Sequence, residues 1–158
     1  MAKPPNDDGR TRIAENRKAR HEYKIDDVFE AGIMLTGTEV KSLRAGQVQL
    51  THAYGEVRGG EVWLVGASIA EYSQGNVANH APERDRKLLL HSREIDTIHG
   101  QVREKGHTIV PTRLYFKNGR IKIEVAVARG KVRIDKRRDI AKRDATRQIE
   151  RELKNRRR

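Results

Sequence analysis

The chain of 158 residues contains no cysteine, which excludes a disulfide framework and any metal site built from thiolates. It also lacks a long hydrophobic run, and no stretch approaches the roughly 20 apolar residues that a transmembrane helix needs. Its opening, MAKPPNDDGRTR, has no apolar segment of the kind found in a signal peptide. These absences lead us to expect a cytoplasmic protein.

Motifs that carry catalysis or hold cofactors are missing as well. The sequence has no P-loop, GxGxxG or GxSxG motif, and its six histidines show neither HxxxH nor HExxH spacing. The carboxylates Asp26, Asp27 and Glu30 lie close together, but nothing beside them indicates the perturbed environment of an acid–base pair. We therefore expect no enzymatic activity, no cofactor and no metal site.

Positive charge is present in excess and is concentrated at one end of the chain. The formal net charge is +12, and residues 129–158 hold fourteen Lys or Arg against five Asp or Glu, a net +9. Two further basic groups stand in RTRIAENRKAR (10–20) and RDRK (84–87). Such an excess attracts polyanions, and nucleic acid is the commonest large one. An anionic membrane surface is the rival, but it would require a broad apolar helix face beside the charge.

The first part of the chain divides into an arm and a strand region. Residues 1–19 have few apolar side chains and two early prolines, so we predict a flexible basic arm. From residue 23 to residue 35 the apolar side chains fall into short strand-like runs, broken at Gly32. The globular domain is therefore expected to begin at about residue 20.

Two helices are predicted within the domain. Thr36 with Glu39 three residues later matches a capping box, and Gly46 supplies a C-terminal stop. Ser92 is predicted to cap a second helix, which Gly100 is expected to interrupt.

The remaining segments are rich in β-strand signals. Gly59-Gly60 and Asn118-Gly119 each separate two apolar runs, as in β-hairpins. In the last run Ile121, Ile123, Val125 and Val127 alternate with Lys122, Glu124 and Ala126, so one face is core and the other meets solvent or a ligand. The single Trp63 lies among Val62, Leu64 and Val65, which favours a place in the core.

About six short strands with two inserted helices, and no regular βαβ alternation, predict a mainly β fold with accessory α-helices. We expect a small OB-fold-like closed β-barrel over residues 20–128, of the kind whose open face receives oligonucleotides. A small β-sandwich with decorating helices is the structural alternative.

The basic C-terminal tail, residues 129–158, carries a narrow apolar stripe at helical spacing, formed by Ile140, Ala141, Ala145, Ile149 and Leu153. Arg143, Arg147 and Arg151 repel one another on the same helix, and an isolated helix of this kind is marginal in water. Phosphates would remove the repulsion. The segment is therefore consistent with a tail that is disordered alone and becomes helical when phosphates line its binding site.

Several blocks of the sequence resemble one family closely. NRKARHEYKIDDVFEAGIMLTGTEVKSLRAG, RKLLLHSREID, LYFKNGRIKIEVAVARGK and DKR occur from about Asn16 to Arg137 in the order and spacing typical of the SsrA-binding protein (small protein B) family. The resemblance implies an OB-like barrel that binds the tRNA-like domain of transfer-messenger RNA (tmRNA, SsrA RNA) and delivers it to stalled ribosomes for trans-translation. It implies no catalysis, with elongation factor Tu and alanyl-tRNA synthetase as functional partners.

The resemblance also implies which residues bind RNA. On the barrel they are Asn16, Arg17, Lys18, Arg20, Glu30, Leu89 and Lys122, with Tyr23 and Lys41 in the same blocks. In the tail, Gly130, Lys131, Ile134, Asp135, Lys136 and Arg137 are expected at the decoding centre of the small ribosomal subunit, beyond which the tail follows the empty mRNA channel. Ile134 departs from the family, which often has His or Tyr there, so aromatic stacking is not expected at this position.

Two other functions stay open. One is a generic OB-fold protein that binds ribosomal RNA or assists ribosome assembly. The other is a membrane- or protein-interaction module, in which the basic clusters on the barrel are incidental. For the function implied by the resemblance we expect a monomer.

Overall fold

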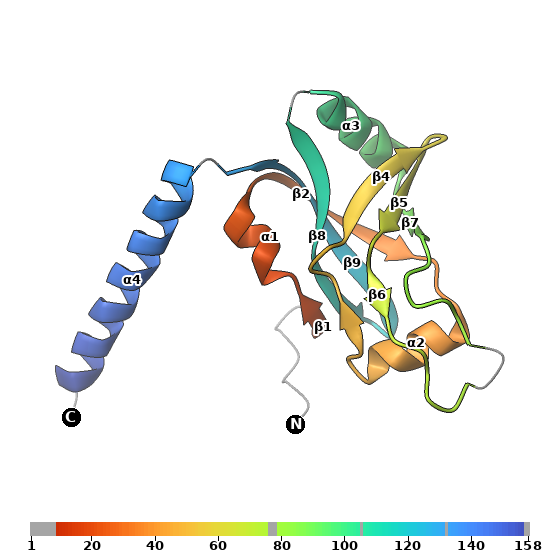
Figure 1. Cartoon of the computed structure of the whole chain (residues 1–158), viewed down its shortest axis with the longest axis horizontal. Helices are drawn as coiled ribbons and strands as arrows, with labels where there is room; N and C mark the ends of the chain where they lie inside the picture. The colour runs from red at the N-terminus through yellow and green to blue at the C-terminus, as the bar shows by residue number, and fades with distance from the viewer. Residues whose placement is uncertain (1–8, 76–78, 105, 132, 157–158) are drawn as a thin grey trace.

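The computed structural model describes residues 9–75, 79–104, 106–131 and 133–156. Within them, seven strands form one antiparallel sheet, namely β1 (Arg10–Glu15), β2 (Tyr23–Ile33), β4 (Tyr54–Arg58), β5 (Glu61–Val65), β7 (Arg86–Leu89), β8 (His107–Lys117) and β9 (Arg120–Gly130). The order β8–β4–β5–β7–β2–β9 returns to β8, so these strands close into a ring, while β1 pairs with the second half of β8 (Figure 1). This arrangement is the small closed barrel that the sequence predicts.

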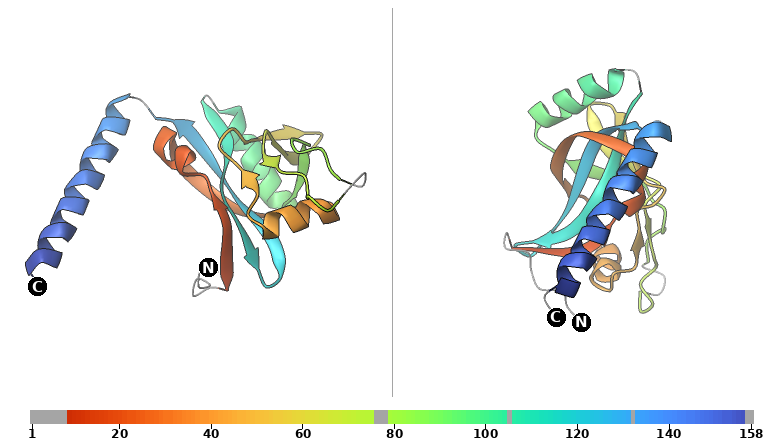
Figure 2. Two further views of the ribbon diagram at one scale, coloured as in Figure 1. Left: turned by 60° about the horizontal axis from the view of Figure 1, so that its bottom comes forward. Right: turned by 90° about the vertical axis from the view of Figure 1, so that its left-hand side faces the viewer.

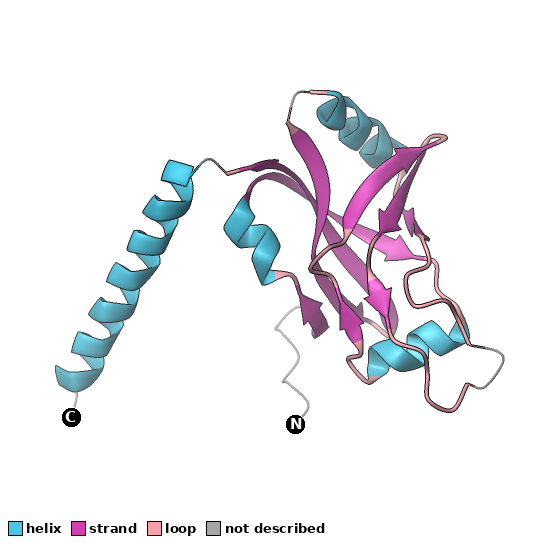
Figure 3. Ribbon diagram, viewed as in Figure 1, coloured by secondary structure: helices cyan, strands magenta, loops and turns pink. Residues whose placement is uncertain are grey.

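The helices lie around this barrel except for the last, which points away from it, as the colouring by secondary structure shows (Figure 3). Helices α2 (Gly37–Arg44) and α3 (Ser92–Arg103) lie toward opposite ends of the barrel in Figure 1. The short α1 (Arg17–Glu22) packs beside β8, and the long α4 (Arg133–Arg156) follows β9. A two-stranded sheet, β3 (Val48–Gln49) with β6 (Ser68–Ile69), completes the fold.

The hydrophobic core fills the barrel. Inward-facing side chains of the strands meet Leu43 of α2 and Ile98 of α3, and all of them are buried. The alternation predicted for β9 holds for Ile123, Val125 and Val127. Farther along β9 the outer face is also buried, because Ala126 and Ala128 form a second cluster with α1 and the start of β2.

Both hairpin turns that the sequence predicts are present. Asn118 and Gly119 join β8 to β9 with φ angles of 51° and 75°, and Gly59 and Gly60 join β4 to β5 with 55° and 77°. Two successive left-handed residues are what a two-residue hairpin turn of type I′ requires, and each of these turns has them. The α2 capping box also forms, since Glu39 Oε1 accepts a hydrogen bond from the Thr36 backbone N–H at 2.9 Å.

The prediction of a flexible arm to residue 19 is wrong for residues 10–19. Residues 10–15 form β1, whose backbone pairs with β8, and α1 begins at Arg17. Sequence periodicity misses β1 because only Ile13 and Ala14 of this strand pack against the core, while pairing with β8 stabilises its whole length. Residues 1–8 lie outside the described part of the chain. The strand region breaks less than expected, because β2 passes through Gly32 as one strand.

Two further expectations need correction. Helix α3 has His91 rather than Ser92 as its N-cap. It continues through Gly100 without interruption, because Ile95 and Ile98 before the glycine and Val102 after it pack against the core. Trp63 is half-buried and alternates with the buried Val62 and Leu64, so it lies on the outer face of β5.

The RDRK segment is not the exposed basic cluster that the sequence suggested. Arg86 is 0 % exposed, and its guanidinium is paired with Glu39, which is also 0 % exposed. Arg84 pairs with the second oxygen of the same carboxylate. The remaining donors of Arg86 reach the carbonyl oxygens of Ala67 and Pro82, each at 3.0 Å. This buried ion triad joins α2, β7 and the segment before β7.

The C-terminal tail is helical from Arg133 to Arg156 and points away from the barrel after a short connection (Figure 2). Its side chains beyond the first turns are exposed, including Ile140, Ile149 and Leu153 of the apolar stripe. The tail thus has the helical form that the sequence indicated, whereas the disorder of the free tail remains a prediction. The barrel strands also extend past Ala128, since β9 ends at Gly130.

Candidate RNA interface

Three strands bring Leu89 and Lys122 together around a glycine. In the sheet register, Gly32 of β2 is paired with Leu89 of β7 on one side and with Lys122 of β9 on the other. A Cβ atom added to Gly32 would lie 3.2 Å from Leu89 Cβ, which is a tight contact. Because residue 32 has no side chain, a depression opens between Leu89 and Lys122.

We call this depression the Gly32 hollow; it measures about 350 Å³ and is lined by Gly32, Ile33, Leu35, Val40, Arg44, Leu89, Phe116, Gly119, Arg120, Ile121 and Lys122. Its walls are mainly apolar, and Leu89 is 51 % exposed although it is a large hydrophobic side chain. An exposed apolar surface within a depression is the expected form of a binding site.

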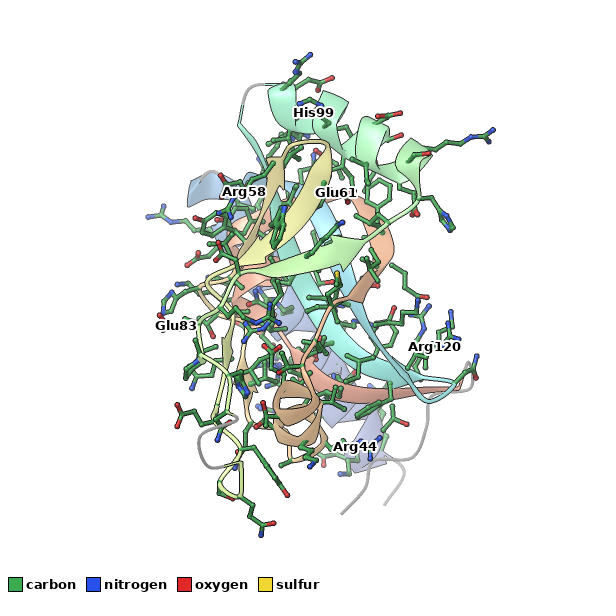
Figure 4. All side chains as sticks on the ribbon, turned by 90° about the vertical axis from the view of Figure 1, so that its right-hand side faces the viewer. Arg44, Arg58, Glu61, Glu83, His99 and Arg120 are labelled. Carbon is green, nitrogen blue, oxygen red and sulfur yellow. The ribbon has the colours of Figure 1, made fainter. Side chains whose placement is uncertain are left out.

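The cations of the hollow are available for a ligand. The side chains of Arg44, Arg120 and Lys122 make no hydrogen bond or ion pair with any other residue in the described ranges. Figure 4 shows Arg44 and Arg120 at the same end of the barrel, away from His99 on α3. An apolar floor with free cations at its rim suits a nucleotide, because the base can lie on the floor while phosphates reach the cations.

Glu30, another predicted residue, lies next to this hollow and is heavily engaged. Its carboxylate accepts hydrogen bonds from Tyr115 Oη at 2.5 Å and Lys117 Nζ at 3.2 Å, and it pairs with Arg10 Nη2 at 3.2 Å. The Tyr115 hydroxyl, followed by Lys117 and Arg10, holds the pKa of Glu30 below its ordinary value against the opposing effect of burial. The carboxylate is therefore ionised at neutral pH.

Asn16 is buried rather than presented to a ligand. It is 5 % exposed and caps α1, where its Oδ1 accepts from the Ala19 backbone N–H at 3.2 Å. Its Nδ2 donates to the carbonyl oxygens of Leu50 and Pro111, at 3.1 Å and 3.0 Å. Both amide hydrogens and the oxygen are thus used within the protein, and Asn16 fixes α1 to the barrel.

Helix α1 carries the predicted basic residues that follow Asn16 in the sequence. Arg17, Lys18 and Arg20 are exposed, while Ala19 between them packs on the barrel. A pocket of about 310 Å³, here called the α1 pocket, opens beside the helix; its lining residues are Asn16, Lys18, Ala19, Glu22, Tyr23, Thr51, His52, Ala53, Tyr54, Thr108 and Val110.

The predicted residues therefore occupy two places. Val110 lines the α1 pocket and Phe116 lines the Gly32 hollow, six residues apart on β8, or about 20 Å at the rise of an extended strand. Lys41 belongs to neither place: it lies on α2 with its Nζ 5.2 Å from the centre of the Tyr72 ring.

The first residues of the tail are held at the end of α1. Gly130 is the last residue of β9 and pairs with Tyr23. The Lys131 N–H donates to the Glu22 carbonyl oxygen at 2.8 Å, and Lys131 Nζ donates to the Arg20 carbonyl oxygen at 3.1 Å and pairs with Asp139. Arg137 is exposed on α4. Ile134, Asp135 and Lys136 belong to the first turn of α4, and their side chains lie outside the described part of the structure.

Sequence reasoning missed several residues of the Gly32 hollow, namely Gly32 itself, Arg44, Phe116 and Arg120. One signal was available, because a glycine inside a strand marks a close approach of another group. The cations had no signal of their own, since Arg44 and Arg120 are distant in sequence and meet only in the folded barrel.

The described residues contain no group of three or more His, Asp or Glu side chains placed to hold a metal ion. None of the described helices is both long and apolar enough to cross a membrane.

Comparison with known proteins gives consistent matches. Residues 13–155 match the family model described as "SmpB protein". The SsrA-binding protein of Thermobifida fusca (strain YX) is 56% identical over 145 residues, which cover 92% of this chain and 91% of that protein. The SsrA-binding protein of Mycobacteroides abscessus is 56% identical over 153 residues, covering 97% of this chain and 96% of the relative.

A solved structure is also similar. It is a chain from "tmRNA-SmpB: a journey to the center of the bacterial ribosome", with 48% sequence identity and a TM-score of 0.65, covering 76% of this chain and 85% of that chain. The family match covers nearly the whole sequence, including both places where the predicted residues lie and most of the tail. This chain therefore belongs to the SmpB family of SsrA-binding proteins.

Proposed function

We propose that this protein binds the tRNA-like domain of tmRNA and delivers it to stalled ribosomes for trans-translation, without catalysing a reaction itself. The related solved structure concerns tmRNA and SmpB in the bacterial ribosome, and the relatives from Thermobifida fusca and Mycobacteroides abscessus are SsrA-binding proteins. The identity of 48–56% extends over most of the chain, so the proposal rests on close relatives.

The observation that carries the proposal is the Gly32 hollow. It combines an exposed Leu89, an apolar floor and three cations that have no partner among the described residues. A bound RNA would place an unstacked base against the floor, and its phosphates would replace the missing partners of the cations. The hollow thereby unites Leu89 and Lys122, two residues that the family resemblance had indicated from separate blocks.

The tail has a separate part in the proposal. Helix α4 is basic, its side chains are exposed from Ile140 to Arg156, and it extends away from the barrel. Gly130, Lys131, Ile134, Asp135, Lys136 and Arg137 are proposed to reach the decoding centre, with the rest of the helix in the mRNA channel. Elongation factor Tu, alanyl-tRNA synthetase and a cytoplasmic location belong to the same proposal.

A generic protein that binds ribosomal RNA is the alternative. It would rely on total charge, most of which lies in the tail, and it would not depend on the shape of the Gly32 hollow. The two functions therefore differ in what a change within the hollow does to binding.

The test is the affinity for the transcribed tRNA-like domain of tmRNA, measured with excess ordinary tRNA as competitor. We expect Lys122→Gln and Leu89→Asn each to weaken binding by roughly tenfold, as for loss of a charged contact or of a stacking surface. Arg93→Gln is the matched control, because Arg93 is exposed on α3, outside the hollow. Equal affinities of the three variants, or no preference over tRNA in the unsubstituted protein, would favour the generic alternative.

A further inference from the structure

A hydrogen bond between Tyr115 and Glu30 crosses β9 beside the Gly32 hollow. Tyr115 belongs to β8 and Glu30 to β2, with β9 between them, and the oxygen atoms are 2.5 Å apart. In the sheet register Tyr115 is opposite Lys122. Glu30 is opposite Glu124, two residues farther along β9. The bond therefore passes between Lys122 and Glu124, next to a cation of the hollow.

The Glu30 carboxylate gathers donors from two other strands. Lys117 Nζ lies 3.2 Å from Oε1 and 3.4 Å from Oε2, and Arg10 Nη2 lies 3.2 Å from Oε2. With the Tyr115 hydroxyl, these contacts occupy most of the acceptor capacity of a carboxylate. A free carboxylate would also repel RNA phosphates. Glu30 is therefore better placed to hold cations than to contact RNA itself.

Tyr115 cannot contact RNA directly. Its side chain is only 2 % exposed, and the Arg10 guanidinium lies above its ring at 4.8 Å from the centre. Burial and the neighbouring Glu30 raise the pKa of Tyr115, so its hydroxyl remains protonated and donates to the carboxylate. Any influence of this hydroxyl on RNA must pass through Glu30.

We propose that Tyr115 is a positioning residue for RNA recognition, whose buried hydroxyl fixes Glu30 so that Lys117 and Arg10 stay in place beside Lys122. This inference rests on the proposed function. A fixed array of cations loses less side-chain freedom when phosphates bind than cations on mobile side chains do. Phenylalanine at position 115 keeps the ring beneath Arg10 and removes only the hydroxyl that orients Glu30.

The experiment compares Tyr115→Phe with Tyr72→Phe. Tyr72 is the matched control, because its hydroxyl bonds to Gln74 outside the hollow. We expect Tyr115→Phe to weaken binding to the tRNA-like domain by roughly tenfold, the effect of losing a hydrogen bond to a charged group. Tyr72→Phe should stay within about twofold, as is usual for surface changes.

A double-mutant cycle separates positioning from direct contact. Glu30→Gln should cost much less in the Tyr115→Phe background than alone, because both changes disable the same array. Additive losses would overturn the proposal, as would equal affinities of Tyr115→Phe and Tyr72→Phe. A protein without preference for the tRNA-like domain would instead refute the proposed function, and this is measured on the unsubstituted chain.

Thermal unfolding of each variant shows whether a loss of affinity reflects loss of folded protein. If Tyr115→Phe does not fold, Lys117→Gln provides the same cycle from the surface, since Lys117 is about one-third exposed. Coupling between Lys117→Gln and Glu30→Gln supports the array, and additivity of these two changes refutes it.

Discussion

At the scale of single residues, the buried Glu39 shows how a helix cap and an ion triad depend on one carboxylate. Its oxygens accept from the Thr36 backbone N–H, from Arg84 and from Arg86, and neither the Glu39 nor the Arg86 side chain is exposed. A buried pair of this kind contributes little in comparison with apolar residues, but removing one partner leaves an uncompensated buried charge.

We therefore expect Glu39→Gln to lower the free energy of unfolding by about 3–5 kcal/mol, measured by urea denaturation. Glu61→Gln is the control, because Glu61 forms an exposed pair with Lys87 at 3.6 Å and its loss should cost no more than about 1 kcal/mol. Similar losses in both variants would mean that the triad contributes no more than a surface pair.

Glu39 also makes the stability of the folded protein depend on pH in the acidic range. Burial alone would raise the pKa of Glu39, but the bonds from Arg84, Thr36 and Arg86 outweigh it and hold the pKa below the ordinary 4.5. The stabilisation is therefore complete above pH 4.5 and is lost as the pH falls through the lowered pKa of the folded state. Glu39→Gln should show a shallower loss of stability over this acidic range.

At the scale of elements, the junction between α1 and α4 determines the direction in which the tail leaves the barrel. Lys131 donates to the carbonyl oxygens of Glu22 and Arg20, at the C-terminal end of α1 where such groups lack helical partners. Its Nζ also pairs with Asp139, which lies in the second turn of α4. This bond holds the pKa of Asp139 below its ordinary value. One side chain thus links two helices.

We expect Asp139→Asn to broaden the distribution of distances between spin labels on α3 and the start of α4. Labels at His99→Cys and Ala141→Cys are suitable, because both residues are exposed and the chain has no cysteine of its own. Asp144→Asn is the control, with the same change of charge at an exposed position on the same helix. Indistinguishable distributions would show that the pair with Lys131 does not orient the tail.

At the scale of the whole molecule, shape and charge are divided between two parts. The barrel carries the Gly32 hollow and the α1 pocket, whereas most of the net charge lies in the tail. Charge alone supplies affinity that depends on salt and carries little specificity. The proposed function therefore assigns recognition of the tRNA-like domain to the barrel and contact with ribosomal RNA to the tail.

A chain ending at Gly130 keeps β9 whole and reduces the net charge from +12 to +4. We expect it to retain its preference for the tRNA-like domain over tRNA, while its binding to unrelated RNA weakens and becomes less dependent on salt. Peptide tagging on stalled ribosomes should be abolished. Collapse of the preference on truncation would instead make the tail the principal RNA contact.

Local patterns in the sequence were sufficient for much of this protein. The Asn118-Gly119 and Gly59-Gly60 hairpins and the Thr36 capping box formed as predicted, because each depends on residues that are neighbours in the chain. The predicted alternation of β9 holds for Ile123, Val125 and Val127 but not for Ala126, which is buried on the other face. The asymmetry of charge and the absence of cysteine are likewise properties of the sequence alone.

Tertiary structure decided the features that need partners distant in sequence. Arg86 looks like a surface cation in the sequence, but in the fold it is buried and paired with Glu39. The sequence also gives no sign that the amide of Asn16, a predicted RNA contact, holds α1 to the barrel. The Gly32 hollow exists because β7, β2 and β9 become neighbours in the closed ring. The sequence alone determined which residues are charged and where the chain turns. Folding decided which charges are neutralised in the interior and which remain free for a ligand, because the neutralising contacts join strands and helices that are far apart in the chain.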